Sequence, residues 1–173
     1  MINLIQMKEI LEIDLTSPSG LRWKVDIGRR IKSKSVAGCL DKSRGYFVIG
    51  INTKTYQNHR IVYALYHNLE LNQLPKGLDH VDRNKTNNNP LNLRPATQSQ
   101  NMDNTGIRPD NTSGIRGVSW FKRDQKWRSL INVDGKSKHL GLFDDIEEAK
   151  KAYEAASLKY KGEYSYICTH LEV

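Results

Sequence analysis

The sequence has few cysteines and no long apolar run. Its 173 residues include only two cysteines, Cys39 and Cys168, which lie far apart and form no CxxC pair. This pattern argues against a disulfide framework and against a zinc site. No apolar stretch approaches the roughly 20 residues of a membrane-spanning helix, and the first residues lack the basic start and cleavage site of a signal peptide. We therefore expect a cytoplasmic protein without a membrane partner.

Positive charge is in excess. Lysines and arginines number 27 against 19 aspartates and glutamates, which gives a net charge of +8. Such an excess fits a polyanion partner such as nucleic acid, although a solvated exterior would produce it as well. Residues 107–140 hold 8 basic and 3 acidic residues, whereas residues 141–173 hold 4 and 7. This distribution is typical of a basic binding face with a more acidic surface behind it.

The first part of the chain shows the patterns of short strands followed by a helix. Strand-like runs LRWKVDI, GYFVIGIN and TKTYQNH occur within residues 20–58, with a turn expected near Asn52 and Thr53. Residues 59–69 then place apolar side chains at helical spacing. The Gly, Pro, Asn and Asp content of residues 106–113 is typical of a linker.

The last third predicts three strands and one helix that covers them. The runs GVSWFKR, KWRSLINV and KSKHLGLF are separated by Asp-Gln and Asp-Gly turn signals. A helix follows over residues 145–161, with Asp144 and Glu147 as a capping box and Gly162 where it should end. Its apolar stripe needs a surface to cover, which the strands would supply. The stripe consists of Ile146, Ala149, Tyr153, Ala156 and Tyr160.

The segment GLDHVDRNKTNNNPLNLR, residues 77–94, concentrates groups suited to chemistry. In a strand, Asp79 and His80 would point to opposite sides. A carboxylate can bind a hard divalent cation, and a neutral histidine can take a proton from water near pH 7. An Asp-His pair by itself can equally be a structural pair at a strand end.

The asparagines that follow predict a tightly bonded loop, because their side chains can bond their own backbone. We expect Leu91 and Leu93 to anchor the return of the loop, with Asn92 between them tying it down. The other asparagines are interpreted as loop braces that take no part in chemistry. These are Asn84, Asn87 and Asn88.

A short helix is predicted to begin at Thr97, with Gln100 completing a capping box and Asn101 and Asn104 on one face. The combination of D-H, N-x-x-x-N-N, N-L-R and a helical N-x-x-N resembles the HNH nuclease family, in its phage and intron-encoded branch. The resemblance covers residues 59–105, with His-Arg at its start.

The HNH resemblance implies a role for four of these residues. His80 would be the general base that activates water, and Asn92 would bond across the loop and so orient His80. Asp79 and Asn101 would hold one divalent ion, Mg²⁺ or Mn²⁺, which stabilises the departing 3′ oxygen. Where other members have a histidine at the last metal position, this chain has Asn101, so metal binding should be weaker and should depend on DNA.

A second resemblance covers residues 113–165. The IRGV segment, the Lys-Trp pair before the second strand, LGLF and the helix EEAKKAYEAASLKYKGE are similar to the APETALA-type DNA-binding domain of plant ethylene-response factors. In that family the sheet lies in the major groove. Arg116 aligns with a DNA-contacting arginine of the family, and Lys126 and Trp127 align with a lysine and an aromatic residue at the start of the second strand.

Other candidates for DNA contact follow from charge and spacing alone. Arg123, Arg128 and Lys138 are plausible contacts to phosphate or guanine. The sequence departs from the plant pattern at Ser119, Phe121 and His139, so its target specificity does not transfer. Trp120 and Trp127 could instead be core residues.

Four residues keep two interpretations. His59 either contacts substrate or caps and packs the helix that follows, and Asn104 is more typical of a helix end than of a metal ligand. Arg29 and Arg30 either contact phosphate or belong to a solvated face.

We therefore expect an α+β protein with a central ββα-metal nuclease module, preceded by small strands and followed by a three-stranded antiparallel sheet backed by one helix. The expected segments are a basic DNA-contacting segment (1–58), the HNH core (59–105), a linker (106–113) and the DNA-binding domain (114–166).

The predicted function is a metal-dependent DNA endonuclease, phage-encoded or homing, that acts in the bacterial host cell. It would be a monomer whose partner is double-stranded DNA and which has no small-molecule substrate. The alternative is a sequence-specific DNA-binding regulator that does not cut. A nuclease of structured RNA is less favoured, because no exposed aromatic stacking platform is evident.

Overall fold

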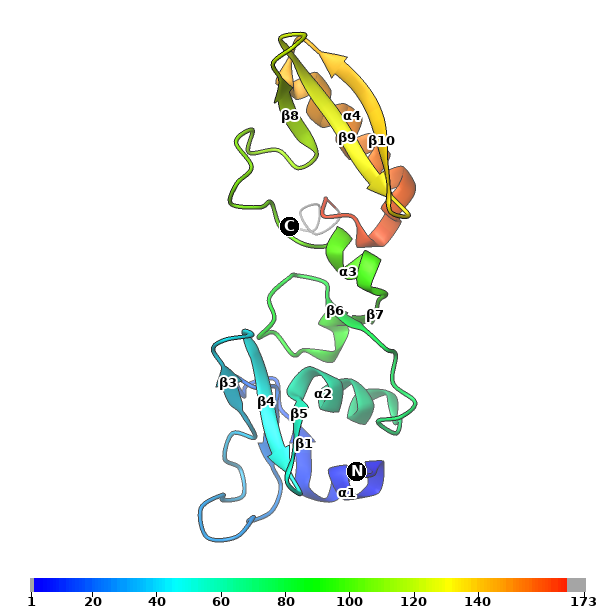
Figure 1. Ribbon diagram of the computed structural model, residues 1–173. Helices are drawn as coiled ribbons and strands as arrows, with labels where there is room; N and C mark the ends of the chain where they lie inside the picture. The colour runs from blue at the N-terminus through cyan, green and yellow to red at the C-terminus, as the bar shows by residue number, and fades with distance from the viewer. Residues whose placement is uncertain (1, 168–173) are drawn as a thin grey trace. The chain divides into compact units, whose positions relative to one another are not determined.

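The computed structural model describes residues 2–167 and divides the chain into two compact units, Met1–Thr97 and Gln98–Val173 (Figure 1). Each unit has its own apolar core and is described by itself. Cys39 is a free, exposed thiol, and Cys168 lies outside the described residues. Among the described helices, none is long and apolar enough to cross a membrane.

The first unit opens with a helix that the strand patterns did not predict. α1 spans Leu4–Ile10, and Asn3 and Gln6 close its N-terminus with a reciprocal capping box. An asparagine followed three residues later by glutamine is the signal that locates this helix start. β1 (Leu11–Ile13) and β2 (Leu21–Trp23) then pair antiparallel.

A three-stranded antiparallel sheet follows, in the order β3 (Cys39–Asp41), β4 (Tyr46–Ile51) and β5 (Lys54–Gln57). Asn52 and Thr53 have φ angles of 49° and 64° and form the tight turn between β4 and β5. Left-handed conformations at both central residues are typical of the hairpin turns that match strand twist. The predicted turn at this position is confirmed.

The predicted helix at 59–69 is confirmed as α2 (Asn58–His67), whose inner face is buried. β6 (Leu78–His80) and β7 (Leu93–Pro95) pair antiparallel, and the loop between them contains the 3-10 turn η1 (Pro90–Asn92). One apolar core contains side chains from α1 through β7. The N-terminal strands and the Asp-His segment therefore fold as one body.

Of the two leucines expected to anchor the loop, one was predicted wrongly. Leu93 is buried, with 5% of its surface exposed, whereas Leu91 is 77% exposed. Leu91 lies in η1, where a 3-10 turn rotates successive side chains by roughly 120°. Pro90 is buried in its place.

The second unit begins with α3 (Gln98–Asp103) and confirms the predicted three-stranded sheet. Its antiparallel order is β10-β9-β8, with positive φ at Gln125 and at Asp134 in the two predicted turns. The strands are β8 (Val118–Phe121), β9 (Lys126–Val133) and β10 (Lys136–Phe143).

α4 (Ile146–Lys161) covers this sheet and is followed by the 3-10 turn η2 (Gly162–Tyr164) (Figure 1). Ala149, Tyr153 and Ala156 are buried against the sheet as predicted, whereas Tyr160 is 41% exposed.

The N-cap of α4 differs from the prediction. Asp145, with its backbone still extended, accepts from the Glu147 N–H over 3.0 Å, so the helix begins one residue later than an Asp144 cap would place it. Asp144 instead accepts a bond from Lys126.

Two buried polar residues open α2. Asn58 is fully buried, and its Nδ2 donates to the carbonyl oxygens of Ser19 and Ala37 over 3.2 and 2.8 Å. His59 is 5% exposed, and burial lowers its pKa from 6.5 to about 3. A buried imidazole is cheaper to keep neutral than charged, so His59 is a neutral core group at physiological pH.

Acid should therefore destabilise the first unit. Because the folded pKa of His59 lies below the unfolded value, the unfolded chain binds more protons between pH 6.5 and about 3. The free energy of unfolding should fall in this window by up to about 1.4 kcal/mol per pH unit. Urea unfolding at pH 7.5 and at pH 5 measures the loss, which His59→Gln should reduce and His67→Gln, at an exposed histidine, should not. An equal loss in both variants would contradict this assignment.

Two glycines before β8 should differ in their tolerance of a side chain. Gly114 and Gly117 both have left-handed backbones, with φ of +69° and +73°. A Cβ at Gly117 would lie 2.2 Å from the Tyr153 ring and 2.5 Å from the Leu130 carbonyl oxygen, whereas a Cβ at Gly114 meets nothing within 4 Å. Gly114→Ala should cost about 1 kcal/mol, and Gly117→Ala about 3 kcal/mol or more. Urea unfolding measures both, and equal stability of the two variants would contradict the close packing.

Candidate functional site

Asp79 and His80 lie on β6, the strand that pairs with β7. In the register of this pair, Asp79 lies opposite Arg94 and His80 lies opposite Leu93. Both side chains are buried, with 9% of Asp79 and 4% of His80 exposed. A buried carboxylate and a buried imidazole both need partners that compensate for lost hydration.

Arg94 is a partner of Asp79 that sequence reasoning left without a role. Its Nε and Nη2 donate to Asp79 Oδ2 over 3.0 and 2.8 Å, in an ion pair whose side chains are 12% and 10% exposed. Both arginine N–H groups therefore converge on the same carboxylate oxygen. Arg94 does reduce the net negative charge that Asp79 offers to a cation.

Asn88 is a partner of His80. The His80 Nε2 lies 3.3 Å from Asn88 Oδ1, and Asn88 Nδ2 donates to the Ser19 carbonyl oxygen over 3.0 Å. Because the amide nitrogen is used on a carbonyl, the oxygen must face the ring. An oxygen acceptor assigns the ring proton to Nε2 and leaves the lone pair on Nδ1. The prediction gave Asn88 only a bracing role, so its contact with the ring is an addition.

Asn92 ties the loop that follows β6. Its Oδ1 accepts from the Asp82 N–H over 3.0 Å, and its Nδ2 donates to Asp82 Oδ1 and to the Asn87 carbonyl oxygen, each over 2.9 Å. Its own carbonyl accepts from the Val81 N–H over 2.9 Å. The expected bonds across the loop are thus present, and they hold the chain directly after His80.

Two aromatic groups complete the surroundings of His80. The ring centroids of Tyr46 and His59 lie 6.0 and 5.2 Å from that of His80, and 5.2 Å from each other. His59 Nδ1 is buried without a hydrogen-bond partner among the described residues, which fits a packing role. Burial lowers the pKa of His80 below 6.5, with the Asn88 contact acting in the opposite direction. The imidazole is therefore neutral near pH 7.

Asn101 lies on α3, in the second unit. Its Oδ1 is buried and lacks a hydrogen-bond partner within the described part of the chain. Asn104, just after the helix, is 2% exposed, and its N–H donates to the Gln100 carbonyl oxygen over 3.1 Å. Across residues 2–167, no group of three or more histidines, cysteines, aspartates or glutamates is arranged to hold a metal.

Of the side chains of the sheet that were predicted to contact DNA, Arg123 and Arg128 lie together, whereas Lys138 lies elsewhere. The guanidinium carbons of Arg123 and Arg128 lie 5.2 and 4.9 Å from the Phe121 ring centroid. Lys138 Nζ instead lies 4.2 Å from the Tyr160 ring centroid, on α4. Arg123 also forms an ion pair with Asp124 over 2.7 Å, and Arg128 Nη2 lies 3.5 Å from Ser119 Oγ.

The neighbours of this cluster are the two tryptophans and Lys126. Trp127 and Trp120 meet edge to face, with ring centroids 5.1 Å apart, and Trp120 is 46% exposed. Trp127 packs partly against the core. Lys126 forms an ion pair with Asp144 over 3.0 Å.

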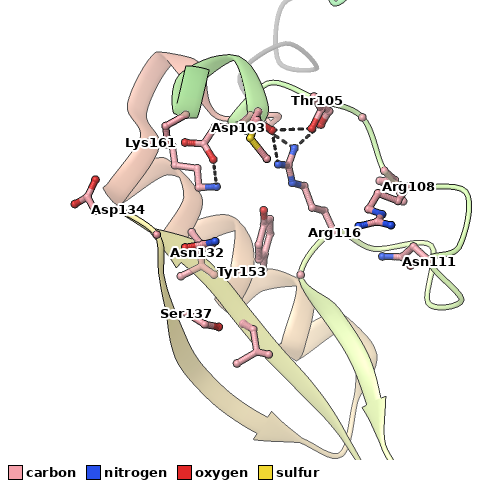
Figure 2. A pocket seen from close by; sticks show the side chains of 18 of the residues that line it. Asp103, Thr105, Arg108, Asn111, Arg116, Asn132, Asp134, Ser137, Tyr153 and Lys161 are labelled. Carbon is pink, nitrogen blue, oxygen red and sulfur yellow. Dashed lines mark hydrogen bonds and ion pairs between the residues drawn. The ribbon is translucent and has the colours of Figure 1, made fainter. Parts of the chain in front are cut away.

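Arg116, which aligns with a DNA-contacting arginine of the family, bonds the backbone at the end of α3. Figure 2 shows its guanidinium turned toward the end of α3, where it donates to the carbonyl oxygens of Met102 and Asp103, each over 2.8 Å, and to that of Thr105. Arg29 and Arg30, in the first unit, are exposed next to the Ile27–Ile31 bridge, which fits a phosphate contact and a solvated face equally.

Comparison with known proteins supports two separate likenesses. Residues 113–163 match the model of the AP2 domain family. Protein 3.8 of Escherichia phage T7 is 37% identical over 76 residues, which cover 43% of this chain and 63% of that protein. The AP2-like ethylene-responsive transcription factor TOE2 of Arabidopsis thaliana is 34% identical over 70 residues, 40% of this chain and 14% of the plant protein.

The third relative is the uncharacterized HNH endonuclease L560 of Acanthamoeba polyphaga mimivirus, 28% identical over 111 residues that cover 63% of this chain and 55% of that protein. This match is longer than the AP2 segment and therefore includes residues outside it. The matches span less than two thirds of each relative's length, and no solved structure matches. The chain thus contains an AP2 DNA-binding domain at residues 113–163 and has a distant HNH endonuclease relative.

Proposed function

We propose that this protein is a metal-dependent HNH endonuclease that hydrolyses phosphodiester bonds in double-stranded DNA and leaves 3′-hydroxyl and 5′-phosphate ends. The AP2 domain would bind DNA, and Asp79, His80 and Asn101 would form the nuclease centre. The observation that supports this most directly is the setting of His80: a buried, neutral imidazole at a strand end, whose Nε2 faces an anchored amide oxygen.

The available donors fit a hard divalent ion such as Mg²⁺ or Mn²⁺. Asp79 supplies a carboxylate, and Asn101 supplies an amide oxygen that is buried and lacks a hydrogen-bond partner among the described residues. With Arg94 beside Asp79 and a neutral amide as the second donor, affinity should be low until DNA is present. When bound, the ion would stabilise negative charge on the phosphate and on the leaving 3′ oxygen.

The protein groups around His80 would handle the proton. His80 would take it from the attacking water as the general base, with Asn88 Oδ1 facing its Nε2. Asn88 would act as a positioning residue that fixes the tautomer of His80. Asn92 would fix the strand end through its bonds to Asp82 and Asn87.

The flanking basic elements would supply site preference. A small nuclease centre touches few bases, so a linked DNA-binding domain lengthens the recognised sequence and raises the effective concentration of the site. Such a division of labour suits a phage or homing endonuclease. The second candidate is a regulator that binds DNA without cutting it. Its support is the AP2 domain, which the nuclease proposal shares.

Cleavage of supercoiled plasmid separates the two candidates. With Mg²⁺ or Mn²⁺, we expect the parent protein to nick or linearise the plasmid, and chelation to abolish cutting. His80→Ala should reduce the rate by about 100-fold or more, because a general base contributes on that scale. His67→Ala, at an exposed histidine of α2, should cut like the parent. Plasmid that is bound but left uncut under both ions would favour the regulator.

Asn88 offers a test of how His80 is held. Asn88→Ala removes the amide that meets the ring and should lower the cleavage rate at saturating DNA by about 10-fold or more, with DNA affinity unchanged. Asn84→Ala is the matched control, since Asn84 is exposed and the described bonds of its side chain go to Thr86 in the loop. Equal rates in the two variants would show that the Asn88 contact has no role in catalysis.

A further inference from the structure

The end of α3 is held by two cations from the AP2 domain. Arg116, just before β8, donates to the carbonyl oxygens of Met102, Asp103 and Thr105. Lys161, the last residue of α4, forms an ion pair with the Asp103 carboxylate over 2.5 Å, and only 6% of its side chain is exposed. Both contacts lie within the second unit (Figure 2).

The backbone after Arg116 is shaped so that this side chain is aimed at α3. Gly117 has φ +73°, and a Cβ there would collide with the Tyr153 ring. The Gly117 carbonyl accepts from the Leu130 N–H over 2.8 Å, which fixes it to β9. The Arg116 guanidinium also lies 5.9 Å from the Tyr166 ring centroid. Arg116 is therefore fixed on several sides, unlike a surface arginine that waits for a ligand.

The contact suits a helix end. The last carbonyl groups of a helix have no partner within the helix and carry partial negative charge. α3 has only six residues, Gln98–Asp103, too few to be stable without outside support. One guanidinium on three carbonyl oxygens, with an ion pair beside it, supplies that support.

We propose that Arg116 is a positioning residue for α3, the helix that carries Asn101, and that it is not a DNA contact. This inference rests on the proposed function for its link to catalysis, since Asn101 is the proposed metal ligand. It departs from the family alignment, which assigns the equivalent arginine to DNA. DNA would then be bound by Arg123, in the β8–β9 turn, and by Arg128, on β9. Both lie near the Phe121 ring.

The test compares Arg116→Ala with Arg123→Ala in the full chain. Arg123 is the matched control, because its side chain is 78% exposed on the β8–β9 turn and its described ion pair is with the neighbouring Asp124. Three quantities are measured: affinity for a fluorescent duplex, hydrogen exchange of the peptide covering residues 98–105, and plasmid cleavage across Mg²⁺ concentrations. For Arg116→Ala we expect affinity within about twofold of the parent, faster exchange by about tenfold, and cleavage that falls and needs more Mg²⁺.

For Arg123→Ala we expect the opposite pattern, with affinity reduced about fivefold or more and exchange of residues 98–105 unchanged. An Arg116→Ala protein that loses affinity as Arg123→Ala does, or whose α3 exchange stays at the parent rate, would overturn the proposal. If the parent does not cut, the proposed function fails, while the affinity and exchange results still decide the role of Arg116. If Arg116→Ala does not fold, Arg116→Lys keeps the charge without the fork that reaches three carbonyls, and should show the same pattern in milder form.

Discussion

The fold of the first unit depends on one chain of polar contacts, from the Ser19 backbone through the Asn88 amide to the His80 ring. Asn88 is 3% exposed, and its nitrogen is committed to the Ser19 carbonyl, so its oxygen can only face the imidazole. Buried polar groups of this kind are costly unless paired, and once paired they specify one arrangement. Gly20 is part of this arrangement, since a Cβ there would lie 2.9 Å from the Asn88 Cβ. The loop between β1 and β2 therefore holds Asn88 against His80, and under the proposed function it would help to build the nuclease centre.

The second unit contains the AP2 domain and also a helix, α3, that lies outside the AP2 match. α3 precedes the matched segment, 113–163, yet the unit that contains the AP2 domain begins at Gln98. Two residues of the AP2 domain contact the end of α3. Arg116 bonds its carbonyl oxygens, and Lys161 pairs with the Asp103 carboxylate. An AP2 domain used in this way would position α3 as well as bind DNA. The linker between them would then be a loop inside one folded unit.

Local signals in the sequence were enough to predict most of the regular helices and strands. Alternating apolar residues and Asp-Gly turn chemistry placed β9 and β10, and Gly162 marked the end of α4. Contacts between distant segments were not predictable in this way. Asn88 meets Ser19 across 69 positions, and Arg94 meets Asp79 only because β6 and β7 pair. The asparagine run predicted a braced loop, but only packing decides which asparagine reaches the imidazole.

The state of the His80 ring tests the central claim most directly. Nitrogen-15 chemical shifts of the imidazole, recorded near pH 7, distinguish a charged ring from each neutral tautomer. The account predicts a neutral ring with its proton on Nε2, held by the Asn88 oxygen, and a loss of that preference in Asn88→Ala. A ring that is charged near pH 7, or that carries its proton on Nδ1, would contradict it.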